Sequence, residues 1–458
     1  MLGLARIPSL PISFEDAVPL LKALNDHGPL ASSLGEAWTP GGLLHKGVKY
    51  NIGPSPSDIV LHVVNEQAYE ITPIHDLVGI INGTNADEVV IVGNHHDAWT
   101  LGGAGDPHSG SAALNEIVRG FGEALEKGWK PRRTLIFARW DSEEYGMTGS
   151  TEWVEQYLPW LSGAGVAYLN SDPGVTGSEF HANAAPLVDH VILRSANDVL
   201  SPNQTVPGQT LGDLWTAGIA TLGGGSDYSA FLDHAGVTSL DLGFRPAPDA
   251  PTYHYHSNYD SITYMEKIID PNFAYHIALA QVWGLIAAEL VEKPIIPFNT
   301  THYAVSLKDY IENVKDIYQR RQATSTSPHL NHLSDAADRF FRSATSFDER
   351  TAILSGSVSL QDCPRTWRSS KRSAACAEVK RMNKKLQNLE RQFLLDEGLD
   401  GRPWFKHTVF APGFWEGYAG VTLPGLRERV KAGDEKGIKK WEKILVDALD
   451  KASDLLDE

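Results

Sequence analysis

The chain has 458 residues, of which 42% are hydrophobic and 21% charged, and these values predict two to four domains of a soluble globular protein. The formal net charge of −17 argues against nucleic acid or an anionic membrane as a partner, because phosphate binding needs clustered Lys and Arg. Only Cys363 and Cys376 are present, which excludes a disulfide scaffold and a thiolate-rich zinc site and leaves the pairing of these two open. Any metal must therefore be held by His and carboxylate side chains.

The first residues lack the charged and apolar regions of a signal peptide, and no apolar run approaches the ~20 residues of a membrane span. Sequons at Asn82, Asn203 and Asn299 would permit glycosylation in the secretory pathway.

Residues 1–74 are rich in Pro and Gly and contain short apolar stretches such as residues 59–64. Such stretches suit strands better than helices. We therefore expect a small β-rich region here.

Residues 75–296 alternate apolar runs with amphipathic segments, which is typical of an α/β domain with a mostly parallel sheet. Residues 89–93 are expected to form a buried strand. Apolar side chains at helical spacing predict a helix over residues 114–125, which Gly128 and Pro131 end before a strand at 134–138. Further strands are expected at residues 166–169 and 239–243.

Beyond Pro297 the strand signals fade, and apolar residues recur with helical period. Two such sets are Leu307, Tyr310, Ile311, Val314, Ile317 and Tyr318, and Ile438, Trp441, Leu445 and Leu449. Residues 297–458 therefore form a predicted helical domain, whose apolar faces serve either the core or a dimer interface.

Acidic or His-containing segments follow four of the predicted strands. They are residues 94–97, 141–144, 170–172 and 253–260. In open α/β sheets ligands bind beyond the carboxyl ends of the strands, so these segments can converge although they lie far apart in sequence. The sequence thus predicts one site rich in imidazole and carboxylate groups.

The order of these residues resembles the co-catalytic zinc peptidases, and most closely the glutamate carboxypeptidase and transferrin receptor type. The matching motifs are Gly-Asn-His-His-Asp-Ala-Trp (93–99), Gly-Gly-Ala-Gly-Asp-Pro-His-Ser-Gly (102–110), Trp-Asp-Ser-Glu-Glu-Tyr-Gly (140–146), Gly-Ser-Thr-Glu-Trp (149–153), Tyr-His-Ser (255–257) and Tyr-Ala-Gly (418–420). The resemblance covers nearly the whole chain. It implies a partial apical, or protease-associated, region (1–74), a dizinc peptidase domain (75–296) and a helical transferrin-receptor-like dimerisation domain (297–458).

The resemblance also implies the metal ligands. One zinc would be held by His95 and Asp172, a second by Glu144 and His256, and Asp106 would bridge both. Imidazole and carboxylate ligands suit zinc independently of the resemblance. Two ions ~3.5 to 4 Å apart can share a hydroxide and polarise a carbonyl, which would hydrolyse a peptide bond.

Other site residues follow from the same resemblance. Glu143 would be the general base, Asp97 would orient the imidazole of His95, and Tyr255 would donate to the developing oxyanion. The candidate substrate-binding residues are Asn51, Ser226 and Tyr418. Glu152 and Glu155 are candidate ligands of a structural calcium ion.

The chain departs from the glutamate-specific pattern at positions where relatives carry cationic side chains. A Lys directly before the Tyr-Ala-Gly motif is replaced by Gly417, and a basic cluster corresponds to Ala182, Asp241 and Gly243. The sequence also begins where related proteins are midway through their apical domain. We therefore expect an N-terminally truncated homologue whose longer form lies in the secretory pathway, in a vacuole, outside the cell or on a membrane anchor.

The expected function is a zinc exopeptidase acting on peptides as a homodimer, with the carboxypeptidase type favoured. An aminopeptidase using the same site is the main alternative. A non-catalytic receptor-like binding protein is the other, and the presence of every zinc ligand and of Glu143 argues against it.

Overall fold

The computed structural model describes residues 7–38, 41–321, 330–357, 370–415 and 417–458. By its contacts the chain divides into two units, Met1–Pro73 and Ile74–Glu458. Cys376 is half of a disulfide bond, and Cys363 lies outside the described residues.

The described residues of the first unit form one α-helix, α1 (Phe14–Ala23), which Ser13 caps by accepting the N–H of Asp16. Three short 3₁₀ helices follow, at Ala31–Leu34, Glu36–Trp38 and Leu44–Lys46. Within its described part this unit has no strand, so the expected β-rich region is wrong. The apolar residues 59–64 run as irregular chain, with Val60 82% exposed, because no neighbouring strand is present to pair with them.

A seven-stranded sheet forms the centre of the second unit, with strand order β1-β3-β2-β4-β7-β5-β6. The neighbours β3, β2, β4 and β7 are parallel, whereas β1 pairs with β3 and β5 pairs with β7 in antiparallel fashion. The strands are β1 (Leu77–Ile81), β2 (Asn85–His95), β3 (Arg133–Trp140), β4 (Gly165–Asn170), β5 (Glu179–Ala184), β6 (Ile219–Ala220) and β7 (Thr238–Arg245).

The four parallel strands are the strands that the apolar runs predicted. Val89, Val90, Ile91 and Val92 of β2 are all fully buried, and β4 is buried along its whole length. Strands covered on both faces are continuous rather than alternating in hydrophobicity, which explains why these runs were recognisable. The mostly parallel α/β sheet is confirmed.

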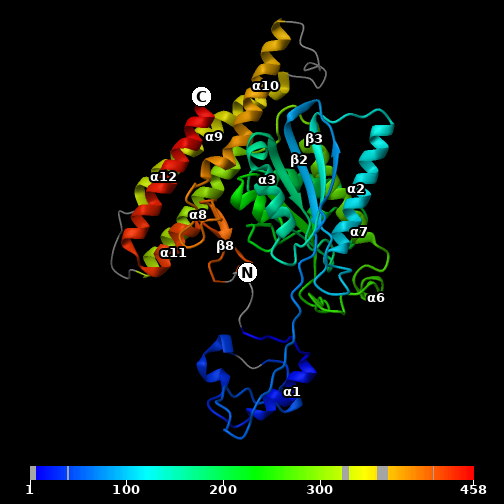
Figure 1. Ribbon diagram of the computed structural model, residues 1–458. Coiled ribbons are helices and arrows are strands. Elements are labelled where there is room, and N and C mark those ends of the chain that lie inside the picture. The colour runs from blue at the N-terminus through cyan, green and yellow to red at the C-terminus, as the bar shows by residue number, and fades with distance from the viewer. Residues whose placement is uncertain (1–6, 39–40, 322–329, 358–369, 416) are drawn as a thin grey trace. The chain divides into compact units, whose positions relative to one another are not determined.

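Helices cover both faces of the sheet. The helices of this part are α2 (His108–Glu126), α3 (Thr148–Ala164), α4 (Asp189–Asp198), α5 (Leu211–Leu214), α6 (Ile262–Tyr264) and α7 (Ala274–Glu292), with π-helical turns at Ala230–His234 and Met265–Ile269. Helices α2 and α7 pack together on one face, and α3 lies on the other (Figure 1). The crossover β2-α2-β3 and the crossover β3-α3-β4 run in opposite directions along the sheet. Because both crossovers are right-handed, α2 and α3 lie on opposite faces of the sheet. The loops after the neighbouring strands β2 and β3 therefore leave toward opposite faces, which opens a crevice at the carboxyl end of β2 where ligands bind in such sheets.

Helix α7 is long and apolar enough to cross a membrane by length and composition, contrary to the expectation that no run of this length exists. In the structure it is a core helix. Leu279, Val282, Trp283, Ile286 and Leu290 are fully buried, and α7 contacts α2, α4 and three strands of the sheet.

The last part of the chain is mainly helical, as predicted (Figure 1). Its helices are α8 (Thr300–Arg321), α9 (Asn331–Ser357), α10 (Ser370–Leu389), α11 (Pro424–Ala432) and α12 (Glu435–Asp457), and a 3₁₀ helix spans Glu390–Phe393. The predicted apolar faces of α8 and α12 are buried within the chain, because both helices pack against α9. A short hairpin, β8 (Phe410–Pro412) with β9 (Gly420–Thr422), interrupts the helices.

The helical part is tied to the amino ends of the parallel strands. Asn383 of α10 donates to Glu88 at the start of β2, and Glu88 forms a buried ion pair of 2.6 Å with Arg133 of β3. Gln387 donates to the carbonyls of Asp87 and Ala164. The opposite, carboxyl edge of β2, β3 and β4 carries the predicted site residues.

Candidate metal centre

The structure brings all five predicted zinc ligands together at the carboxyl edge of the sheet. His95 is the last residue of β2, Glu144 follows β3, and Asp172 follows β4. Asp106 lies in the loop that precedes α2, and His256 lies in the loop after β7. Four of these side chains reach the site from loops, so only the fold can show that they meet.

Asp106 lies between two His–carboxylate pairs. Its Oδ1 is 3.2 Å from Nε2 of His95, and its Oδ2 is 3.4 Å from Nε2 of His256. Nε2 of His95 is also 3.0 Å from Asp172 Oδ1, and Nε2 of His256 is 2.9 Å from Glu144 Oε2. The two oxygens of Asp106 thus face two different imidazoles, each paired with another carboxylate. A carboxylate that bridges two metal ions needs this geometry.

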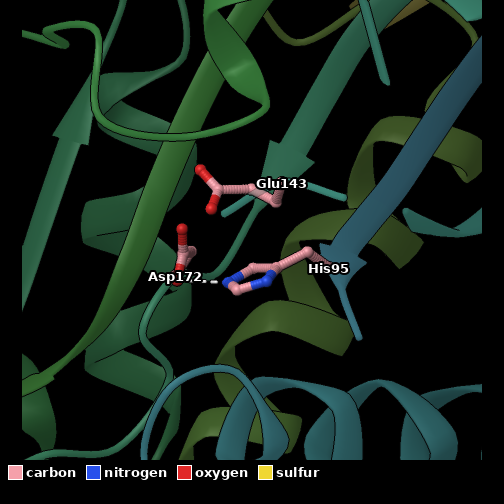
Figure 2. A group of neighbouring side chains, drawn as sticks. All are labelled: His95, Glu143 and Asp172. Atoms are coloured by element: carbon pink, nitrogen blue, oxygen red, sulfur yellow. Dashed lines mark hydrogen bonds and ion pairs between the residues drawn. The ribbon is translucent and has the colours of Figure 1, made fainter. Parts of the chain in front are cut away.

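Glu143 and Glu144 occupy different surroundings although they are adjacent. Glu144 Oε1 accepts the backbone N–H of Trp99 at 2.7 Å, and its other oxygen faces His256. The carboxylate of Glu143 lies near that of Asp172, as Figure 2 shows, and one of its oxygens lies within 4.8 Å of ligand atoms of both Asp172 and His95. It accepts no hydrogen bond from the described residues. Glu144 is therefore held from two sides, whereas the carboxylate of Glu143 has no such partner among the described residues.

The cluster of buried carboxylates strongly favours positive charge. Burial and the charge of Asp172 raise the pKa of Glu143 to about 10, and burial and Asp106 raise the pKa of Glu144 to about 7. Burial lowers the pKa of His95, but the neighbouring Asp172 and Asp106 outweigh it and raise that pKa well above its ordinary value. The neighbouring carboxylates thus favour a positive charge at His95.

The same residues fit bound zinc. Asp106 Oδ1 is buried and receives no hydrogen bond from the described residues, although it faces His95. Ligand atoms of His95, Glu143 and Asp172 lie within 4.8 Å of one another, and so do those of His95, Asp106 and Glu144. Imidazole nitrogen and carboxylate oxygen are the donors that catalytic zinc sites use, and cations would offset the buried negative charge.

Asp97 supports the site in two ways. Its backbone carbonyl lies 3.0 Å from Nδ1 of His95, and its carboxylate Oδ1 lies 3.5 Å from the same nitrogen. The carboxylate also accepts the backbone N–H groups of Glu143 and Glu144, at 3.0 and 3.3 Å. Asp97 therefore orients both the imidazole and the loop that presents the two glutamates.

Aromatic side chains surround His256. The rings of Tyr255 and Trp99 both stack on its imidazole, with centroid distances of 3.8 and 5.7 Å. The hydroxyl of Tyr255 lies 3.2 Å from that of Tyr418, and both side chains are exposed. Although the Tyr255 side chain is 48% exposed, partial burial of its hydroxyl and the hydrogen bond to Tyr418 raise the pKa of Tyr255, which favours the protonated phenol.

Two site loops contain non-glycine residues in the left-handed region. Ser142, directly before Glu143, has φ 60°, and His256 has φ 52°. Such backbone conformations are uncommon for these residue types and persist where the surrounding structure imposes them. The loops therefore hold their side chains in conformations that the local sequence disfavours.

The predicted substrate-binding residues have different surroundings. Tyr418 is exposed beside Tyr255, and its loop packs on Gly223, where a Cβ would lie 1.7 Å from the Tyr418 carbonyl oxygen. Asn51 belongs to the first unit, where its amide bonds to the backbone of Asp26 and Gly28. Ser226 is 1% exposed, and its hydroxyl donates to Asp172 at 2.5 Å. Ser226 therefore contacts a proposed zinc ligand, and its role in substrate binding stays a prediction.

The residues suggested for calcium do not form a cluster. Glu152 is exposed on α3, and Glu155 accepts a hydrogen bond from the indole of Trp404 at 2.7 Å. Among the described residues, neither belongs to a group of three side chains that could hold a metal.

Asp241 is a supporting residue that the sequence did not indicate. Its carboxylate accepts the backbone N–H of Asp172 at 2.9 Å and the side-chain amide of Asn170 at 3.0 Å. Sequence comparison treats this position only as the loss of a basic residue. An acidic residue inside an apolar strand, such as this one in β7, is the signal that could have identified it.

Comparison with known families divides the chain into two matched parts. Residues 76–279 match peptidase family M28, and residues 328–457 match the transferrin receptor-like dimerisation domain. The described helices of the second part are those from α9 onward.

Similar proteins carry two kinds of name. A probable glutamate carboxypeptidase of Arthroderma benhamiae is 38% identical over 93% of this chain and 56% of its own length. The aminopeptidase NAALADL1 of Rattus norvegicus is 31% identical over 96% of this chain and 59% of its own length. The chain thus spans a little over half the length of these relatives. A crystal structure of a zinc aminopeptidase from Bacillus subtilis aligns with a TM-score of 0.35 and 22% identity, over 46% of this chain and 48% of that one.

Proposed function

Since the chain belongs to peptidase family M28 and carries a transferrin receptor-like dimerisation domain, we propose that it is a zinc-dependent exopeptidase, with the carboxypeptidase type favoured. The observation that carries the proposal is the position of Asp106, whose two oxygens face His95 and His256 separately. In this proposal His95 and Asp172 hold one zinc ion, Glu144 and His256 hold the other, and Asp106 is shared.

Bound zinc ions would polarise the substrate carbonyl and lower the pKa of a water molecule, so that this water can lose a proton and attack the carbonyl carbon. Glu143 takes the proton of that water on its carboxylate and passes it to the nitrogen of the leaving amine. Two observations favour Glu143 over Glu144 for this role: Glu144 is held by Trp99 and His256, and Glu143 accepts no hydrogen bond among the described residues.

Further side chains orient these groups. Asp97 holds the imidazole of His95 and the backbone of Glu143, so the base keeps its position relative to the ligand. Tyr255 carries a protonated hydroxyl beside His256 and is the proposed donor to the oxyanion that forms on the carbonyl oxygen. Its bond to Tyr418 orients that hydroxyl at the open side of the site.

An aminopeptidase is the second candidate, because similar proteins carry both names. The carboxypeptidase type is favoured because relatives of that name reach 38% identity, against 31% for the aminopeptidase. Peptides with free ends, with a blocked amino end and with a blocked carboxyl end separate the two. A carboxypeptidase cleaves the first two and spares the third, and an aminopeptidase cleaves the first and third.

The zinc-loaded chain and its Glu143→Gln variant, prepared in parallel, should be tested together, so that cleavage by a contaminant is recognised. Zinc binding without cleavage of any of the three peptides would contradict the enzymatic proposal and favour a receptor-like binding protein.

We expect only a weak preference for C-terminal glutamate. Gly417 offers no cation to a side-chain carboxylate, and a hydrogen bond to a charged group contributes about 1.5–3 kcal/mol, or roughly 10- to 150-fold. The ratio of kcat/KM for peptides ending in Glu and in Gln measures this preference. A ratio well above 100 would show that another cation replaces the missing one.

Substitution at the same position provides the matched test. A Cβ at Gly417 would meet no atom within 4 Å, although its φ of 77° disfavours other residues. Gly417→Lys should raise the Glu-to-Gln ratio, and Gly417→Ala controls for the backbone strain and should leave the ratio unchanged.

Three further features are proposed: a homodimer, a location in the secretory pathway and a structural calcium ion. A homodimer formed through the helical part is supported by the match of residues 328–457 to a dimerisation domain. A location in the secretory pathway is supported by the exposed sequon residues Asn82 and Asn203, while Asn299 is half-buried and accepts the N–H of His302. A structural calcium ion at Glu152 and Glu155 stays a prediction from the resemblance alone.

A further inference from the structure

Asp260 is a buried carboxylate that lies close to two proposed zinc ligands and that the proposed reaction does not use. It follows His256 in the same loop and is 3% exposed. No cation lies within ion-pair distance of it among the described residues. A buried charge of this kind must be stabilised by hydrogen bonds.

The partners of Asp260 all belong to the loops that carry Asp106 and His256. Its Oδ1 accepts the backbone N–H of Gly105 at 2.8 Å, and its Oδ2 accepts the backbone N–H of Asp106 itself at 3.1 Å. The hydroxyl of Tyr253 also donates to Oδ2, at 2.8 Å. In addition, the backbone carbonyl of Asp260 accepts the N–H of Ala104 at 3.1 Å.

Glycines allow this close contact between the two loops. A Cβ at Gly102 would lie 2.4 Å from the carbonyl oxygen of Asp260, and one at Gly105 would lie 2.9 Å from the hydroxyl of Tyr253. Side chains at these positions would force the loops apart. The glycine-rich stretch 102–105 therefore serves the approach of its backbone to Asp260.

From this geometry we infer that Asp260 is a positioning residue that joins the loop of Asp106 to the loop of His256 and thereby sets the bridging carboxylate. The inference rests on the proposed zinc site. Asp106 must direct one oxygen toward His95 and the other toward His256, so a small rotation of its backbone breaks one of the two contacts. Asp260 fixes that backbone by accepting the N–H of Asp106 and of the residue before it.

A carboxylate is needed at this position because an amide cannot make the same bonds. Both oxygens of Asp260 accept a backbone N–H. In Asp260→Asn one of them becomes an NH₂ group, which donates and therefore faces a backbone N–H without bonding to it. Whichever way the amide turns, either Gly105 or Asp106 loses its acceptor.

The test is the zinc affinity of the purified chain, measured by competition with a chelator of known affinity. Loss of a partner that orients a metal ligand typically weakens metal binding by about 10- to 100-fold, and we expect a loss in this range for Asp260→Asn. Tyr253→Phe keeps both backbone acceptors and should weaken zinc binding by about 2- to 10-fold, because it removes one hydrogen bond.

Asp270→Asn is the matched control. Asp270 is 1% exposed and accepts the backbone N–H groups of Ala274, Tyr275 and His276 at the start of α7, and none of these partners is a proposed ligand. Both Asp270→Asn and Asp260→Asn should lower the melting temperature, because each leaves a buried backbone N–H without its acceptor, whereas only Asp260→Asn should weaken zinc binding.

Two results would overturn the inference in distinguishable ways. If the unmodified chain binds no zinc, the proposed function fails and the role of Asp260 fails with it. If the unmodified chain binds two ions and Asp260→Asn binds them equally well, the proposed function stands and Asp260 has a structural role only. Should Asp260→Asn fail to fold, zinc affinity of Tyr253→Phe equal to that of the unmodified chain is the result that contradicts the inference.

Discussion

Replacement of Glu143 by Gln should lower kcat by about 100- to 10,000-fold, or about 3–5.5 kcal/mol on the barrier, and leave zinc content unchanged. Glutamine keeps the shape and polarity of the side chain but cannot accept a proton near neutral pH. The same group is proposed to protonate the leaving amine, so the loss should fall near the upper end of this range. Metal analysis and steady-state kinetics on a peptide substrate measure the two quantities.

Glu144→Gln is the control for this prediction, because it makes the same chemical change at the neighbouring residue. Glu144 faces His256 at 2.9 Å, so loss of its carboxylate should weaken the binding of the zinc ion that these two residues are proposed to share. Excess zinc should therefore restore part of the activity. Zinc titration followed by peptide hydrolysis distinguishes the two variants. Rescue of the Glu143 variant by zinc, without rescue of the Glu144 variant, would mean that the two roles are exchanged.

Asp106→Ala should lose both zinc ions together. Its two oxygens lie 3.2 Å from His95 and 3.4 Å from His256, and no other carboxylate among the five proposed ligands contacts both imidazoles. Removal also leaves His95, Asp172, Glu144 and His256 as two separate pairs, and a pair of protein ligands is fewer than the three that catalytic zinc sites commonly use. Elemental analysis after zinc loading and buffer exchange measures the content.

His256→Ala is the matched variant for this experiment. It removes a ligand of only one proposed ion and should leave the ion held by His95, Asp106 and Asp172. If Asp106→Ala retained one ion and His256→Ala retained none, the shared ligand would be His256 rather than Asp106.

Sequence patterns predicted secondary structure best for strand segments that are buried on both faces along their whole length. Residues 89–93 and 166–169 are buried on both sides, so their continuous apolar character identified β2 and β4. The apolar stretch 59–64 has a similar composition but forms no strand, because pairing depends on a neighbour that composition does not reveal. In the same way, the apolar composition of α7 does not reveal whether the helix lies in a membrane or in a protein core; in the structure it is buried in the core.

The residue types at the ends of β2, β3 and β4 were sufficient to predict a site that binds a metal through imidazole and carboxylate groups. Their motifs also indicated the family, since spacing within each loop is a local property of the sequence. What the sequence by itself determined about this protein is therefore the four parallel strands β2, β3, β4 and β7, the helical character of the last part, the family resemblance and the set of candidate ligands. Each of these depends on residues that are near one another in the chain.

Only the tertiary structure decided which partner each polar side chain meets. Ser226 reaches Asp172, Glu155 reaches Trp404, and Asp260 reaches the backbone of Asp106, all across large separations in sequence. The different surroundings of Glu143 and Glu144 arise in the same way, from Trp99 and His256. Hydrogen bonds need donor and acceptor within about 3 Å, and only the order of the strands and the packing of their loops bring such distant residues that close.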